Sequence, residues 1–222
     1  MTAHGSSAAP SGSGSAGAGP LGAPVRRLDD PSSASLAGLV ATFDELQMVL
    51  RCCERLVNEL AAAGAGGPDE LLVEAVWTTA LLSYARCFAG DDSDGGPGAL
   101  SEEDLTASQP QAGVLEWHRL LLQLRDHYAD RSTNPRERFS VGVTQDSAGA
   151  ASGVAITSVR QPLVDEVTVR QTGAVAYALS GFVNDRIESQ QQTVFDELKL
   201  SSKANLDKLE LLDLDRPAHP GA

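Results

Sequence analysis

The stretch PQAGVLEWHRLLLQLRDHYADRSTNPRERFSVGV, residues 110–143, decides the fold that this chain is expected to adopt. From about Pro110 to Ala129, large apolar side chains recur at three- and four-residue steps, which is the spacing of an amphipathic helix. Asn134-Pro135 ends that pattern, because proline disfavours helical backbone in the residue before it. The expected core stripe of this helix consists of Val114, Trp117, Leu121, Leu124 and Tyr128.

The residues that follow show the alternation of a β-hairpin. Phe139, Val141 and Val143 alternate with polar residues, and Val154 and Ile156 repeat the pattern after a turn that contains glycine. The sequence therefore predicts a hairpin at about 138–160. Because a two-stranded unit is marginally stable alone, we expect it to pack against the helices.

Helical periodicity also appears on both sides of this stretch. One helix is expected from Ser35 to the glycine-rich residues 63–68, and a second from about Pro68 to Phe88. Ser101–Asp104 resembles a capping box, and Pro162 opens the longest helix, which extends to about Leu200. The expected core faces are Leu72, Ala75, Val76, Thr79 and Leu82 in the second helix and Val164, Val167, Ala174, Tyr177, Ala178, Gly181 and Phe182 in the longest. The prediction is a mainly α fold, a four- to five-helix bundle with an inserted β-hairpin before the long last helix.

Composition divides the chain into three parts. Residues 1–34 are rich in Gly, Ser, Ala and Pro and are expected to be a disordered tail. Residues 35–200 are expected to form the helical domain, and residues 201–222 a polar C-terminal tail. The thinner apolar stripe in the second half of the long C-terminal helix makes a homodimer contact there possible.

The net charge of the chain limits the kinds of molecule that it is expected to bind. The 222 residues carry a formal net charge of −13, which argues against general binding to nucleic acid or to an anionic membrane surface. A local basic site is compatible with that balance. No apolar run approaches the roughly 18 residues of a spanning helix, so no membrane partner and a cytoplasmic location are expected.

Neither a metal nor an organic cofactor is expected. The three cysteines, Cys52, Cys53 and Cys87, lack metal-ligand spacing, and the four histidines are scattered. The sequence contains no phosphate-binding glycine loop and no nucleophile elbow.

The candidate site is the arginine-rich end of the helix within 110–143. Arg125, Asp126, Arg131, Arg136 and Arg138 gather there in the sequence. Three further candidates for ligand binding are Glu74 and Arg86, which are charges on the apolar second helix, and His118, which shares a helix side with Arg125.

A helical bundle whose third helix ends in an Arg-polar pair resembles the HEPN domains, over roughly residues 35–200. Many members of that family are metal-independent ribonucleases, whose motif is an Arg, a polar residue and then a His after a short spacer. Arg125-Asp126 matches the first half of the motif, whereas Asp130 and Arg131 stand where the His is expected. The resemblance implies that Arg125 would stabilise phosphate charge and that a His would move the proton of the RNA 2′-hydroxyl.

Three hypotheses follow for these residues. In the first, a non-catalytic HEPN-like domain binds RNA, a nucleotide or an acidic protein segment through Arg125, Arg131, Arg136 and Arg138. In the second, the chain is a ribonuclease of toxin or defence type that uses Arg125 with His127 or His118. In the third, the arginines pair with Asp126, Asp130 and Glu137 and only stabilise the fold of a structural or interaction protein. An arginine at position 131 holds its proton too strongly to act as a general base.

Overall fold

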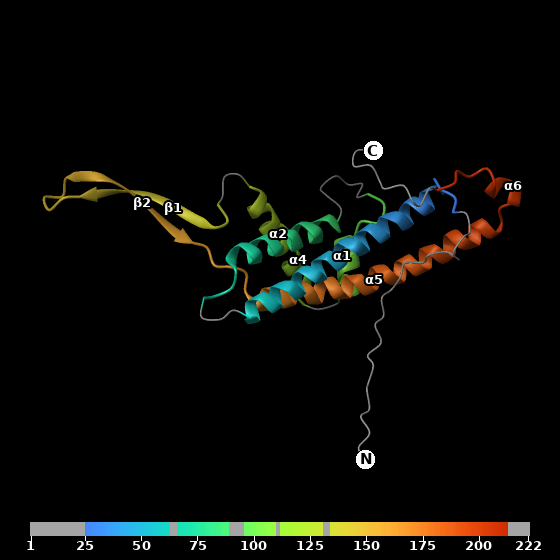
Figure 1. Ribbon diagram of the computed structural model, residues 1–222, viewed down its shortest axis with the longest axis horizontal. Coiled ribbons are helices and arrows are strands. Elements are labelled where there is room, and N and C mark those ends of the chain that lie inside the picture. The colour runs from blue at the N-terminus through green and yellow to red at the C-terminus, as the bar shows by residue number, and fades with distance from the viewer. Residues whose placement is uncertain (1–24, 63–65, 89–95, 110–111, 131–133, 213–222) are drawn as a thin grey trace, which may run out of the picture. The chain divides into compact units, whose positions relative to one another are not determined.

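The computed structural model describes residues 25–62, 66–88, 96–109, 112–130 and 134–212, and it confirms the mainly α fold with a hairpin before a long last helix (Figure 1). The elements in chain order are α1 (Pro31–Ala62), α2 (Glu70–Arg86), α3 (Glu102–Ser108), α4 (Val114–Ala129), β1 (Glu137–Gln145), β2 (Ala151–Arg160), α5 (Glu166–Lys199) and α6 (Lys203–Leu206). One unit, Asp30–Lys199, contains the bundle and the hairpin, and a second unit is formed by the two terminal segments.

Local capping explains where several helices begin. The Asp69 carboxylate accepts a hydrogen bond from the Leu72 N–H at 3.1 Å and caps α2. The predicted capping box is present at α3, where the Ser101 and Asp104 side chains bond each other's backbone N–H. Helix α4 begins at Val114, later than the predicted start at Pro110, because Gly113 adopts a left-handed φ of 90°.

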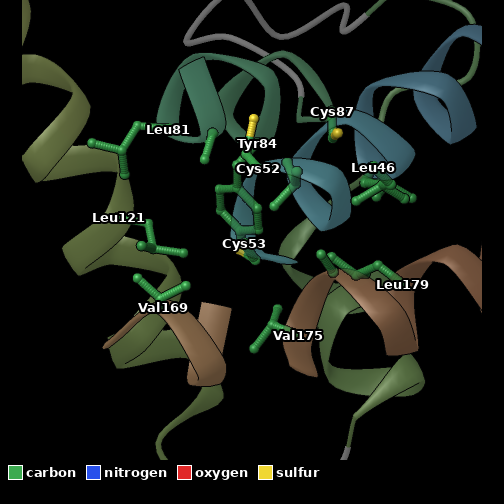
Figure 2. Packing of buried hydrophobic residues seen from close by; sticks show 14 of the residues in the cluster. Leu46, Cys52, Cys53, Leu81, Tyr84, Cys87, Leu121, Val169, Val175 and Leu179 are labelled. Atoms are coloured by element: carbon green, nitrogen blue, oxygen red, sulfur yellow. The ribbon is translucent and has the colours of Figure 1, made fainter. Parts of the chain in front are cut away.

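The core of the bundle is formed mainly by α1, α2, α4 and α5, and α3 adds the buried Leu105. Figure 2 shows Leu46, Tyr84, Leu121 and Leu179 directed into this shared interior, one from each of the four main helices. All four are at most 1% exposed, and buried side chains of this kind supply most of the stability of a small bundle.

The buried face of α5 differs from the predicted one. Val167 and Tyr177 are 73% and 74% exposed, whereas the face turned to the core carries Val169, Leu179 and Val183. The first half of α5 has apolar or small residues on every side, so its periodicity did not single out one face.

A close backbone approach joins α1 to the loop before α3. A Cβ at Gly38 would lie 1.5 Å from the carbonyl oxygen of Pro97, so only glycine fits there. One turn further along α1, the Thr42 hydroxyl donates to the carbonyl of Gly98 at 3.0 Å.

Strands β1 and β2 pair only with each other among the described residues (Figure 1). In their antiparallel register Val141 lies opposite Ile156. Asp146 accepts hydrogen bonds from the N–H groups of Ala148 and Ala150, both at 2.9 Å, and so fixes the turn between the strands.

The expectation that the hairpin packs against the bundle is wrong. Apart from Glu137 and Ala155, which are half-buried, every side chain of the two strands is exposed. The hairpin contacts the bundle through polar side chains at its base. The remaining residues of the hairpin extend beyond the reach of the side chains of the helices. We call Glu137–Arg160 the arm.

The terminal unit is held by its own hydrogen bonds. The Arg27 N–H donates to the Glu210 carbonyl at 2.8 Å, and the Leu212 N–H donates to the Val25 carbonyl at 2.9 Å. The Arg26 guanidinium donates to the carbonyl of Leu209 at 2.6 Å.

Both predicted tails contain helical residues. The tail predicted over residues 1–34 lies outside the described residues up to residue 24. Helix α1 begins at Pro31, earlier than the predicted boundary, and the predicted polar tail 201–222 contains the short helix α6.

Candidate functional site

Arg125 lies on the last turns of α4, at the edge of the apolar face of that helix. Its Nε is 2.7 Å from Oδ1 of Asp126, its neighbour in the chain, and its side chain is 36% exposed. The N–H at Nε is not directed at that oxygen and has no hydrogen-bond acceptor, so the contact is an ion pair only. Beside Arg125 lies a small cavity of about 130 Å³, whose lining is mostly apolar, including Leu81 and Leu82.

His127 does not join Arg125 in a common site. Helix α4 continues without a break to Ala129, and two positions along a helix differ by roughly 200° in direction. Its ring packs edge-on against Tyr128, with centroids 6.4 Å apart. A proton transfer that requires both groups on one phosphate therefore has no support in this geometry.

His118 belongs to the core. It is 3% exposed, its Nδ1 lies 3.0 Å from the hydroxyl of Tyr84, and its ring centroid is 4.3 Å from that of Phe88. Burial lowers the pKa of His118, an effect that Glu102 opposes and Arg119 reinforces. The imidazole is thus kept neutral and enclosed, away from any ligand on the surface.

Arg136 and Glu74 form an ion pair at the base of the arm. The Arg136 Nε donates to Glu74 Oε2 at 2.8 Å, and its second nitrogen lies 2.6 Å from Oε1, so the pair is bidentate. Tyr128 lies beside this pair, and its pKa is raised by burial first and by the Glu74 charge second. Glu74 is thus a structural anchor for the arm.

A second ion pair at the same place was not predicted from the sequence. Arg160, the last residue of β2, donates to Glu70 at 2.9 Å. The residues are 90 positions apart, and only the fold brings them together. Both ion pairs line a cavity of about 430 Å³ between α2 and the base of the arm, together with Glu137.

Of the remaining predicted arginines, none that the structure describes lines this cavity. Arg86 is paired with Glu45 of α1 at 3.3 Å. Arg138 is exposed on β1, and Arg131 lies outside the described residues. The structure therefore brings Glu74 and Arg136 together but does not gather the described arginines into one cluster.

The most distinctive surface is one that sequence reasoning missed. Residues directly opposite in an antiparallel pair share a face, so one face of the arm carries all of its large apolar side chains except Val159. These are Phe139 (55% exposed), Val141 (73%), Val143 (63%), Val154 (75%) and Ile156 (73%). We call them the apolar face of the arm. The alternation in the sequence was the available signal, but it was interpreted as a face turned toward the bundle.

No family model, curated protein or solved structure matches this chain. Within the described ranges, no three side chains of the His, Cys, Asp or Glu type gather in a way that would hold a metal ion. None of the described helices combines the length and the apolar character that crossing a membrane requires.

Proposed function

We propose that this chain is a non-catalytic HEPN-like helical domain that binds a partner protein through the apolar face of the arm. The single observation that carries the proposal is the exposure of five large apolar side chains on one face of a two-stranded hairpin. At roughly 1.5–3 kcal/mol for full burial of each such side chain, their exposed fractions leave about 5–10 kcal/mol available for binding. Exposed patches of this kind mark interaction surfaces.

The electrostatics of the arm's base weigh against a phosphate ligand there. The cavity is lined by Glu70, Glu74 and Glu137 but by only two arginines, Arg136 and Arg160, so its formal charge is 2 − 3 = −1. Each of these arginines already contacts a carboxylate, which a phosphate would have to displace. RNA or nucleotide binding through the arginines is therefore the weaker form of the proposal.

The histidine positions weigh against ribonuclease activity. His118 is enclosed in the core, and His127 points away from Arg125 on a continuous helix. An arginine alone can stabilise a phosphate but cannot accept the proton of a 2′-hydroxyl. The resemblance to HEPN domains is thus proposed to concern the fold and not the chemistry.

Photo-crosslinking tests the proposal directly. A photoreactive phenylalanine analogue replaces Phe139 in the full chain, and the matched control carries it at Arg125. Irradiation of expressing cells is expected to give a covalent protein adduct from position 139 only. An RNA adduct at position 125, or RNA cleavage in EDTA that Arg125→Ala abolishes, would contradict the proposal.

A further inference from the structure

The apolar face of the arm ends, at the base of the hairpin, in a carboxylate. Glu137 lies two positions before Phe139 on β1, so its side chain is on the same side of the hairpin as the apolar face. It is half-buried and makes no side-chain hydrogen bond or ion pair within the described ranges. From Phe139 to Val159 the arm carries one further charge, Asp146, which is in the turn. The surface therefore combines a long apolar part with one negative charge at its base.

The cavity of about 430 Å³ at the base of the arm leaves the charge of Glu137 uncompensated. Three carboxylates line this cavity, and two of them are matched by the arginines of the ion pairs described above. Glu137 is the third. Arg138 follows it in the chain but lies on the opposite face of the hairpin. A group that enters the cavity therefore meets a net negative charge.

The walls of this cavity are partly apolar. Leu71 and Leu163, which are 74% and 38% exposed, both line it, together with Pro135 and Pro162. The side chains of lysine and arginine pack an apolar stem on walls of this kind while their charged end reaches a carboxylate. The volume is within the range of about 300–1,000 Å³ that is typical of ligand pockets. The cavity thus fits a basic side chain.

The chain itself does not offer a segment of matching chemistry outside the described residues. Those stretches contain only Met1, Leu21 and Leu214 as large apolar residues, and their only arginines are Arg131 and Arg216. None of them holds a basic residue with more than one large apolar residue. A second copy of the chain carries the same net charge of −13, so two copies repel each other. A basic partner is instead attracted to an acidic chain.

We infer that the arm and the cavity at its base bind an extended segment of a basic partner protein. A lysine or arginine of that segment enters the cavity and pairs with Glu137, and apolar side chains at alternate positions pack on the apolar face of the arm. This inference rests on the proposed function and specifies the chemistry of its partner.

The geometry of the arm favours an extended segment over a helix. Side chains on one face of a strand repeat every two residues, about 6.8 Å, and an extended segment that runs along the arm has the same repeat. A helix repeats about every 5.4 Å and loses this match within a few turns. The nine residues of β1 are roughly 30 Å long, and two strands are about 10 Å wide, which gives about 300 Å². Stable complexes bury about 800 Å² per partner, so we expect a transient complex.

Two synthetic peptides test the inference on the full chain. The first is Lys-Thr-Val-Thr-Ile-Thr-Val with blocked ends, and the second has glutamate in place of the lysine, so that the first residue carries the only charge. Fluorescence anisotropy is expected to show at least about tenfold tighter binding of the lysine peptide, and higher salt should reduce this difference. Equal binding of the two peptides, or binding of neither at millimolar concentration, overturns the inference.

Variants of the chain assign the binding to the two parts of the site. Glu137→Gln should remove the preference for lysine, whereas Glu103→Gln, an exposed carboxylate on α3, makes the same change in net charge and should preserve it. Val141→Thr combined with Ile156→Thr should weaken the lysine peptide at least about tenfold, and Val159→Thr, on the opposite face, is the matched control. A preference for lysine that survives Glu137→Gln contradicts the pairing in the cavity.

Photo-crosslinking from position 139 separates this inference from the proposed function. In expressing cells, Glu137→Gln should lower the yield of the protein adduct severalfold, and Glu103→Gln should not. An adduct with another protein whose yield does not depend on Glu137 would retain the proposed function and overturn this inference. An adduct between two copies of this chain would also overturn it, and the absence of any protein adduct would overturn both.

Discussion

Replacing Tyr84 by phenylalanine tests whether His118 is locked into the core. Tyr84 is fully buried and His118 is 3% exposed, and the 3.0 Å bond between them is the one contact that the hydroxyl makes among the described residues. Removing the hydroxyl leaves the buried Nδ1 without its partner, which costs about 1–3 kcal/mol in the free energy of unfolding. Against a typical stability of about 5–15 kcal/mol, the loss is readily measured.

Urea unfolding followed by circular dichroism at slightly alkaline pH, where His118 is neutral, measures this loss. Tyr177→Phe is the matched control, because Tyr177 is 74% exposed, and it should change the free energy by less than about 0.5 kcal/mol. In a His118→Leu background the Tyr84→Phe loss should shrink, since the orphaned nitrogen is gone. Equal effects at the two tyrosines would refute the reasoning that places His118 in a closed, ligand-free environment.

Three further outcomes can be measured. Gly38→Ala is expected to lower the free energy of unfolding by about 1–3 kcal/mol, because the added Cβ would meet the backbone of Pro97. Gly181→Ala is the control, and since a Cβ there has nothing within 4 Å it should raise the free energy of unfolding by about 0.5–1 kcal/mol. Changes of the same sign for both variants in thermal melts would contradict the close packing at Gly38. Burial lowers the pKa of His118 in the folded state, so the unfolded state takes up the proton first as the pH falls below the ordinary histidine pKa of 6.5. The free energy of unfolding of the wild type should then fall by up to about 1.4 kcal/mol per pH unit. Urea titrations at several pH values measure this slope, which His118→Leu should flatten. Burial also raises the pKa of Cys53 to about 12, so a thiol reagent near neutral pH should label it only after denaturant is added.

Local signals in the sequence predicted much of the fold. The stripe of α4 and the capping box at Ser101 depend on neighbours within a few positions, and both are present in the structure. The buried face of helix α2 was harder to predict, because the helix is apolar around most of its circumference. Leu82 was expected in its core face and is 43% exposed, whereas Ser83 and Tyr84 are buried.

The candidate site was predictable only in part, because its contacts are long-range. Glu74 was recognised as a charge on an apolar helix and as a candidate for ligand binding. Its partner Arg136 follows 62 positions later, and the sequence does not reveal the pairing. The alternation of Phe139 and Val141 predicted a strand correctly. It did not reveal whether the apolar face meets the bundle or solvent, since both arrangements give the same pattern.

The packing of α1 on α5 has a consequence for how the chain is made. The Gln47 amide of α1 lies 3.5 Å from the hydroxyl of Ser180, which is 133 positions later. At a synthesis rate of roughly 5–20 residues per second, the ribosome adds Ser180 roughly 7–27 s after Gln47. During that interval the apolar side of α1, which includes Leu46 and Leu56, lacks its largest partner surface. The nascent chain therefore exposes part of its future core until α5 has been synthesised.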